Sequence, residues 1–301
     1  MKIITLFTKS DLDYCRTTFR SVRAGMGGQM ITVLNDGSLT DAECTELQTE
    51  LGEGFRVVSR SEADKCLGGH LRLGARLSDL VNRRPVLMKL LHVDVLSDGG
   101  DYLFVDADVI FTRAIDVEAL RGSLSKWDSA ISLNPRFCAY SFRPTDARRV
   151  RGSIFKANSG VFYQRAGLDV AAAAASILQK SEDSYLERPW LEQSTRAQIY
   201  GEFNCGVFAR DDVYTPKPFS SVKDWPPVCH CMGGFRDALT RDVSLSRLNQ
   251  LLASSGKVQI RINEAKHTTM LRYLADYLAK RISDRIWLVR RSFTRNPIGQ
   301  R

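Results

Sequence analysis

The sequence predicts an α/β fold with a mostly parallel sheet flanked by helices. Short, almost wholly apolar segments alternate with helically patterned stretches along its first hundred residues. Strands of this kind are buried on both faces, as in parallel sheets that helices cover on either side. The chain has 301 residues, 44% hydrophobic and 26% charged, which suits one large core and excludes a disordered chain. Because ligands of such sheets bind at the carboxyl ends of the strands, the residues after each strand are the ones to inspect for function.

The first predicted elements follow in a regular order. The apolar segment Ile3 to Phe7 predicts a strand, and helical spacing runs from Asp13 to Ala24. Met30 to Leu34 predicts a second strand, which ends at the turn residues Asn35-Asp36-Gly37-Ser38. These three elements form one strand-helix-strand unit.

A second group of elements leads to a fourth strand. Asp41 to Leu51 reads as a helix and Phe55 to Ser59 as a strand. Apolar positions from Pro85 to Val95 have helical spacing, and Asp98-Gly99-Gly100 ends that helix. The strand Tyr102 to Val105 comes next. Farther along, Asn158 to Phe162 and Asn204 to Phe208 are also expected to be strands.

Membrane-spanning, secreted and disulfide-stapled classes do not fit this chain. The longest apolar run, Val170 to Leu178, is far short of the roughly 18 residues that a spanning helix needs. The apolar stretch at the N-terminus is interrupted at Lys9, too early for a signal peptide. Seven irregularly spaced cysteines predict mostly free, buried thiols, and the Cys229-His230-Cys231 run lacks the usual spacing of structural zinc. We therefore expect a cytoplasmic protein.

The basic charge is concentrated in a C-terminal tail. Residues 268–301 hold eight Lys or Arg and two Asp, a net charge of +6, so the other 267 residues account for only +3 of the total of +9. Apolar residues recur there at steps of three or four, the spacing of one helical stripe: Leu271, Leu274, Leu278, Ile282, Ile286, Val289 and Phe293. A basic amphipathic helix binds an anionic membrane surface or packs on the core. We expect the former, with the protein peripheral on the inner face of the plasma membrane.

Two aspartates follow the fourth predicted strand. Asp106 and Asp108 come directly after Tyr102-Leu-Phe-Val105. Two carboxylates at the end of a buried strand are costly unless a cation neutralises them, although aspartate is also common in turns. Hard oxygen ligands suit Mn²⁺ or Mg²⁺. The pair predicts a divalent-cation site.

A histidine segment completes this set. His230 lies in Cys229-His-Cys-Met-Gly-Gly-Phe-Arg236. A neutral imidazole is a third ligand for the metal, Gly233 allows backbone to approach a phosphate, and Arg236 offers it a guanidinium fork. A histidine by itself is more often structural than a ligand, and the paired aspartates favour the ligand interpretation here.

These motifs resemble those of a known enzyme group. Tyr102-Leu-Phe-Val-Asp106-Ala-Asp108 resembles the DxD motif of GT-A nucleotide-sugar glycosyltransferases. His230-x-x-Gly233-x-x-Arg236 resembles the H-x-x-G-x-x-K element of the retaining group that includes glycogenin and bacterial lipooligosaccharide galactosyltransferases, with arginine in place of lysine. The resemblance implies a GT-A fold, Mn²⁺ (or Mg²⁺) held by Asp106, Asp108 and His230, and a donor diphosphate near position 236.

Further positions match sites of the same group. The resemblance implies that Thr8 and Asp36 meet the nucleotide, that Lys89 lies near its diphosphate, and that Asn158 lines the sugar pocket. Glu192 and Gln193 resemble the acidic-Gln pair beside the reacting sugar carbon. From the residues alone, a plain turn at Asn35 to Ser38 and a solvated Lys89 remain open.

The resulting hypothesis is a metal-dependent hexosyltransferase that uses a UDP-sugar, with retention, to modify a bacterial surface glycan or a lipid-linked acceptor. Residues 1–267 form its catalytic domain and 268–301 its helical tail. An inverting enzyme would instead need a carboxylate base, for which Glu192 and Asp211 are candidates. A nucleotidyltransferase and a protein that binds nucleic acid through its basic tail are the alternatives. Thr8-Lys-Ser-Asp11 lacks the glycines that the former needs, and the local charge disfavours the latter, so no nucleic acid is expected.

Overall fold

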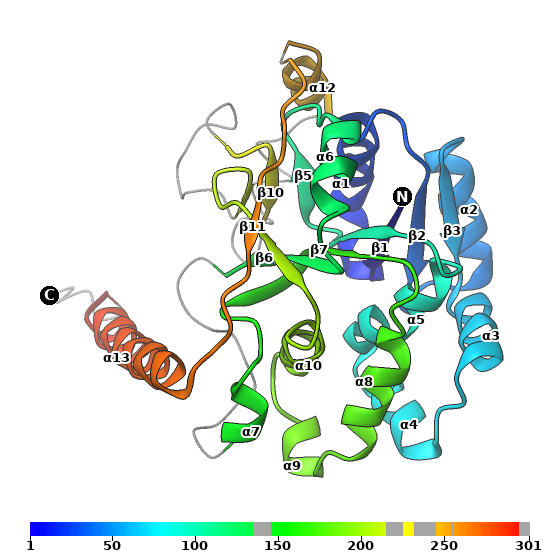
Figure 1. The fold of residues 1–301 in the computed structure, drawn as a ribbon. Helices are drawn as coiled ribbons and strands as arrows, with labels where there is room; N and C mark the ends of the chain where they lie inside the picture. The colour runs from blue at the N-terminus through cyan, green and yellow to red at the C-terminus, as the bar shows by residue number, and fades with distance from the viewer. Residues whose placement is uncertain (135–145, 215–224, 232–244, 255, 295–301) are drawn as a thin grey trace, which may run out of the picture.

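The computed structural model describes residues 1–134, 146–214, 225–231, 245–254 and 256–294. These residues form an eight-stranded sheet, in the order β11-β8-β6-β7-β4-β1-β2-β3, and a three-stranded sheet, in the order β5-β10-β9 (Figure 1). In the large sheet β7 and β11 run opposite to the other six strands. The predicted α/β fold with a mostly parallel sheet is confirmed.

The N-terminal half supplies four parallel neighbours of the sheet and the helices between them. The strands are β1 (Lys2–Phe7), β2 (Ile31–Asn35), β3 (Phe55–Val58) and β4 (Tyr102–Val105). The helices are η1 (Lys9–Asp11), α1 (Leu12–Gly25), α2 (Asp41–Leu51), α3 (Arg60–His70), α4 (Ala75–Arg83), η2 (Pro85–Leu87) and α5 (Met88–Leu96). Every strand and helix predicted in this half is present, within a few residues of its expected bounds.

Two α-helices of this half, α3 and α4, were not predicted. Helix α3 contains Gly68 and Gly69, and a glycine costs about 1 kcal/mol relative to alanine inside a helix. The Ser59 side chain caps its N-terminus by accepting a hydrogen bond from the Glu62 amide at 3.3 Å. Leu67 is buried in the main core. Tertiary packing and the cap therefore outweigh the glycines.

The remaining strands of the large sheet come from the second half of the chain. They are β6 (Ser129–Leu133), β7 (Ala157–Gln164), β8 (Cys205–Phe208) and β11 (Ile262–Glu264). Strand β7 inserts between β4 and β6 and pairs antiparallel with both. The strands expected at 158–162 and 204–208 are thus confirmed. The insertion places the Asn158-Ser159-Gly160 segment beside the end of β4.

Helices cover both faces of the large sheet, and each face has its own apolar core. One core collects residues of α3, α4, α5, α8 (Val170–Gln179) and α10 (Leu191–Tyr200). The other lies under α1, α2 and α6 (Val117–Leu124). Two short helices, α7 (Ala147–Val150) and α9 (Asp183–Leu186), lie along the lower edge in Figure 1. Each fully buried Leu, Ile or Phe contributes about 1.5–3 kcal/mol to this packing.

The small sheet brings distant segments to the end of β4. Its strands are β5 (Val109–Phe111), β9 (Val213–Tyr214) and β10 (Val228–His230). In the antiparallel register of β10 and β5, His230 is opposite Val109. The Cys231 amide donates to the Asp108 carbonyl at 2.9 Å, which extends the same ladder. This register carries His230 to the aspartate pair.

The C-terminal segment ends in a long helix, preceded by α12 (Leu245–Ser254). Helix α13 (Met270–Thr294) contacts the body through Tyr273, which is 3% exposed, and through an ion pair of Asp276 with Lys156 at 3.0 Å. Leu271, Leu278 and Ile282 of the predicted stripe are 59–80% exposed. The helix therefore packs through a face beside the stripe. Among the described residues, no helix is long and apolar enough to cross a bilayer.

Candidate active site

A cavity of about 440 Å³ opens at the carboxyl end of β4. It is lined by residues from α5, the β4–β5 turn, β7, α10 and β10. Seven of the residues predicted for the site line it: Lys89, Asp106, Asp108, Asn158, Glu192, Gln193 and His230. The tertiary structure thus brings together side chains that are separated by up to 141 positions in the sequence.

Asp106, Asp108 and His230 form a compact group that could hold a metal ion. One ligand atom from each lies within 4.8 Å of the others, and among the described residues this is the one such group of acidic, histidine or cysteine side chains. The His230 Nε2 atom lies 3.1 Å from Asp108 Oδ1 and 3.5 Å from Asp106 Oδ2. Two hard carboxylate oxygens and an imidazole nitrogen fit Mn²⁺ or Mg²⁺. The metal-site prediction is therefore consistent with the geometry.

The backbone fixes both aspartates. The Asp106 amide donates to the Gly160 carbonyl at 2.8 Å, which continues the β4–β7 ladder, and the Val109 amide donates to the Asp106 carbonyl at 3.0 Å, which closes the turn.

Burial, followed by repulsion from Asp108, raises the pKa of the Asp106 carboxyl, although Lys89 opposes this. Burial works to lower the pKa of the His230 imidazole, but the Asp108 carboxylate outweighs it and the net pKa is raised. A positive charge placed between these groups would relieve the repulsion of the two aspartates.

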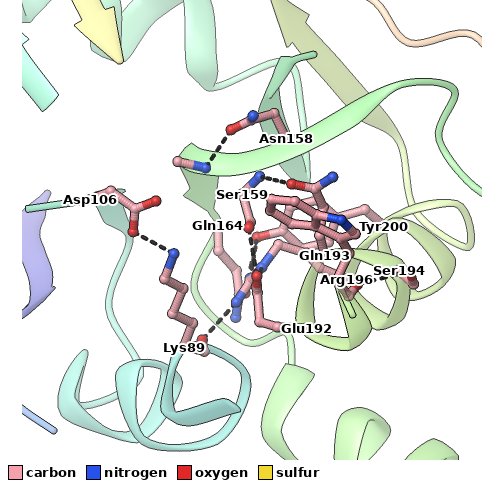
Figure 2. Close-up of polar contacts among 12 residues, drawn as sticks. Lys89, Asp106, Asn158, Ser159, Gln164, Glu192, Gln193, Ser194, Arg196 and Tyr200 are labelled. Carbon is pink, nitrogen blue, oxygen red and sulfur yellow. Dashed lines mark hydrogen bonds and ion pairs between the residues drawn. The ribbon is translucent and has the colours of Figure 1, made fainter. Parts of the chain in front are cut away.

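Lys89 supplies one such charge. Its ammonium group pairs with Asp106 (Figure 2) and lies 5.4 Å from the centre of the Phe104 ring. Burial lowers the pKa of this amine, but Asp106 and Glu192 together raise it above its ordinary value. Lys89 is 8% exposed, so the interpretation as a solvated surface lysine is wrong.

The other wall of the cavity is a network of amide, hydroxyl and carboxylate groups. The Ser159 hydroxyl donates to Glu192 Oε2 at 2.5 Å, and the Ser159 amide donates to Gln193 Oε1 at 3.4 Å. The Asn158 amide group donates to Asn134 Oδ1 at 2.9 Å and accepts from the Gly160 amide at 2.8 Å. Figure 2 shows Ser159 on the side of β7 that faces Glu192 and Gln193 of α10, with Asn158 on the other side of the strand. They form a preorganised polar wall.

Gly160 makes room for the histidine. A Cβ atom at this position would lie 2.1 Å from His230 Cε1 and 2.2 Å from Nδ1, well inside van der Waals contact. The absence of a side chain at 160 thus lets the imidazole reach the two aspartates.

A second, smaller cavity of about 150 Å³ continues the cleft on the side of β1. Thr8 and Asp36 line it, and it shares Val86, Lys89, Asp106 and Asp108 with the larger cavity. The Asp36 carboxylate accepts from the Ser38 amide at 2.9 Å, in a turn that leads from β2 to helix α2. The two cavities therefore meet at the aspartate pair and Lys89.

Comparison with solved structures identifies the fold. A galactosyltransferase, LgtC, solved in complex with donor and acceptor sugar analogs, superposes with a TM-score of 0.52 at 14% identity, over 86% of this chain and 97% of that one. This likeness, which extends over most of both chains, decides the matter. The chain has the GT-A fold. The bifunctional glycosyltransferase WbbM has a TM-score of 0.50 at 10% identity, over 84% of this chain and 52% of that one. No family model and no curated protein matches the sequence.

Some residues predicted for the site lie away from the cleft or outside the described residues. Gly233 and Arg236 fall outside the described residues. Asp211, one of the two candidate bases, has a side chain that is 88% exposed, pairs with Arg261 at 3.3 Å and does not line the cleft. Cys229 and Cys231 flank His230 with pKa values raised by burial, which disfavours the thiolate form that zinc binds.

The GT-A cleft also contains residues that sequence reasoning missed. Trp190 lines the larger cavity, is 57% exposed and has a left-handed backbone with φ of 59°, a conformation that is costly for a bulky residue. Arg196 is fully buried behind the cavity wall. The Glu192–Arg196 spacing of i, i+4 on a helix was the available sequence signal. No local pattern marks Trp190.

Proposed function

We propose that this chain is a metal-dependent glycosyltransferase that moves a hexose from a UDP-sugar to a bacterial surface glycan or a lipid-linked acceptor. The observation that carries the proposal is the Asp106, Asp108 and His230 ligand set at the junction of the two cavities. The smaller cavity, with Thr8 and Asp36, is where the proposal places the nucleotide. The larger one is where it places the sugar.

The junction of the cavities suits a diphosphate. Asp106, Asp108 and His230 would hold Mn²⁺ or Mg²⁺, which when bound neutralises charge on a departing diphosphate. Lys89 adds a buried positive charge beside Asp106. Arg236 and the backbone at Gly233 are proposed to contact the same phosphates. Unchanged UDP affinity of Arg236→Ala in calorimetry would remove Arg236 from the site.

The polar wall supports transfer with retention. Asn158, Ser159, Glu192 and Gln193 are proposed to orient the sugar. An inverting enzyme needs a carboxylate free to take a proton from the acceptor. Both oxygens of Glu192 already accept hydrogen bonds, from Ser159 and Arg196, and Asp211 lies away from the cleft. Retention is therefore the proposed stereochemical outcome.

A panel of nucleotide sugars tests the proposal. We expect mass spectrometry to detect slow hydrolysis or transfer of one UDP-hexose in the presence of Mn²⁺, with release of UDP. A nucleotidyltransferase would release pyrophosphate from a nucleoside triphosphate instead. Binding of none of the UDP-sugars in calorimetry, with Mn²⁺ present, would contradict the proposal.

Residues 268–301 are proposed to place the enzyme on the inner face of the plasma membrane, in the cytoplasm. The stripe residues Leu271, Leu278 and Ile282 are exposed on α13. The tail has a net charge of +6, and each basic residue near an anionic leaflet contributes about 1 kcal/mol. Exposed apolar side chains beside excess positive charge are typical of helices that lie in the headgroup plane.

Replacing the three exposed stripe residues tests the tail. In the triple variant Leu271→Ser, Leu278→Ser, Ile282→Ser, we expect binding to anionic vesicles to weaken by at least about tenfold, a change of about 1.4 kcal/mol, while turnover of a soluble donor stays unchanged. Sedimentation with phosphatidylglycerol vesicles measures the binding. Met30→Ser, at a residue that is 61% exposed outside the tail, is the matched control. Equal sedimentation of the triple variant and the wild type would assign the stripe no role in the membrane.

A further inference from the structure

Arg196 is a fully buried charge with hydrogen bonds in three directions. From α10, its Nε donates to Glu192 Oε1 at 3.1 Å, its Nη2 to the Lys89 carbonyl at 2.6 Å, and its Nη1 to the Tyr200 hydroxyl at 3.2 Å. Its guanidinium carbon lies 3.5 Å from the centre of the Phe162 ring. The side chain is 0% exposed, so these contacts replace its water entirely.

Stability alone is a poor explanation for this arrangement. Moving a guanidinium and a carboxylate out of water is costly, and apolar residues of similar volume often stabilise a core as well or better. The surroundings of Arg196, which include Phe162 and Tyr200, would accept such a residue. Because the buried ion pair is costly, we look for its role in positioning the residues that it contacts.

The partners of Arg196 belong to the two halves of the cleft. The Lys89 backbone is on α5, and its side chain reaches Asp106 of the metal-ligand set. Glu192 is on the first turn of α10 and bonds Ser159 of the polar wall. Figure 2 shows Arg196 between Lys89 and Glu192. Arg196 itself does not line the cavity.

We infer that Arg196 is a positioning residue, which fixes the phosphate-and-metal half of the cleft relative to its sugar half. The planar fork of the guanidinium donates to the α5 backbone and to the α10 carboxylate at once, so a relative shift of the two helices breaks one of the bonds. Proper distance between the leaving diphosphate and the sugar would depend on this link, because misplacement by about 1 Å can cost about 10² in rate. The inference rests on the proposed function of the cleft.

Arg196→Lys tests the link while keeping the buried positive charge. The compact ammonium cannot reproduce the fork, so we expect kcat to fall at least tenfold with the donor KM and the Mn²⁺ affinity changed less than threefold. Tyr200→Phe is the matched control: it removes the third hydrogen bond of the same guanidinium, on the side away from the cavity, and should leave kcat unchanged. All rates are measured well below the melting temperature of each variant.

A merely structural role of Arg196 gives a different result. Both variants would then have lowered melting temperatures and unchanged kcat, and that outcome would overturn the inference. Crystals of the wild type with UDP and Mn²⁺ provide a second measurement if the lysine variant does not fold. They should retain both the Arg196–Lys89 and the Arg196–Glu192 bonds, and loss of either would overturn the inference. Wild-type protein that neither binds UDP nor turns over a donor would contradict the proposed function instead. In that case, ligand-free crystals of Arg196→Lys still show whether the variant displaces Glu192 from Lys89.

Discussion

Asp108→Asn should abolish metal-dependent turnover while leaving the fold intact. Asp108 is 2% exposed, and its Oδ1 lies 3.1 Å from His230 Nε2 in the ligand set. Asparagine has the same shape but removes one of the two negative charges that attract the cation. If the bound ion contributes about 4 kcal/mol to the transition state, its loss lowers the rate by about 10³.

Donor turnover, Mn²⁺ titration and the melting temperature measure these effects. The melting temperature should change little, because the variant also removes the repulsion between Asp106 and Asp108. Excess chelator should inactivate the wild type to the same extent, and re-addition of Mn²⁺ should restore it. Full wild-type activity in chelator would rule out the metal role.

Gly160→Ala should disable the same site by a steric route. The added Cβ would lie 2.1 Å from His230 Cε1, a distance that real Cβ contacts essentially never show. The ladder with β5 holds the His230 backbone in place, so the ring can avoid the added Cβ only by rotating, which would change the position of its Nε2 relative to the two aspartates. We expect the Mn²⁺ affinity to fall at least tenfold, turnover to fall with it, and the free energy of unfolding to drop by about 1–3 kcal/mol, as overpacking of a core does.

Two further variants make the Gly160 experiment specific. Gly122→Ala is the matched control, because it lies in α6 with a normal helical φ and no atom within 4 Å of the added Cβ. It should keep full activity and gain up to about 1 kcal/mol of stability. Adding His230→Ala to Gly160→Ala removes the ring and should restore stability without restoring metal binding. Unaltered Mn²⁺ affinity of the single variant would contradict the steric argument.

The part of the sheet that carries the candidate site was predictable because its signals are local. Apolar runs such as Ile3 to Phe7 and Tyr102 to Val105 mark strands directly, and two carboxylates at the end of a buried strand are costly unless a positive charge neutralises them. The first turn after β4 therefore carried the metal hypothesis without knowledge of any neighbour. Helix α3 escaped prediction because its local glycines argue against a helix, whereas its packing, which favours one, is not local.

The face through which the C-terminal helix packs also could not be decided from sequence. Periodicity showed the stripe that contains Leu271, Leu278 and Ile282, but it did not show whether this stripe or its neighbour meets the body. In the structure Tyr273 is buried and Asp276 pairs with Lys156. An amphipathic pattern shows where the apolar face lies around a helix. Which face is covered depends on the surface of the rest of the protein against which the helix packs.

The sequence by itself determined the α/β architecture and the place of the aspartate pair after a strand, because residue type and spacing along one segment suffice for these. It offered His230 as a third candidate ligand only because that pair was present. The tertiary structure alone decided how the site is assembled. The β10–β5 register sets His230 beside Asp108, the missing side chain at Gly160 makes space for it, and Arg196 joins α5 to α10. Each of these relations links segments far apart in the chain, so it depends on the packing of the whole sheet and its helices and leaves no periodic signal in the sequence.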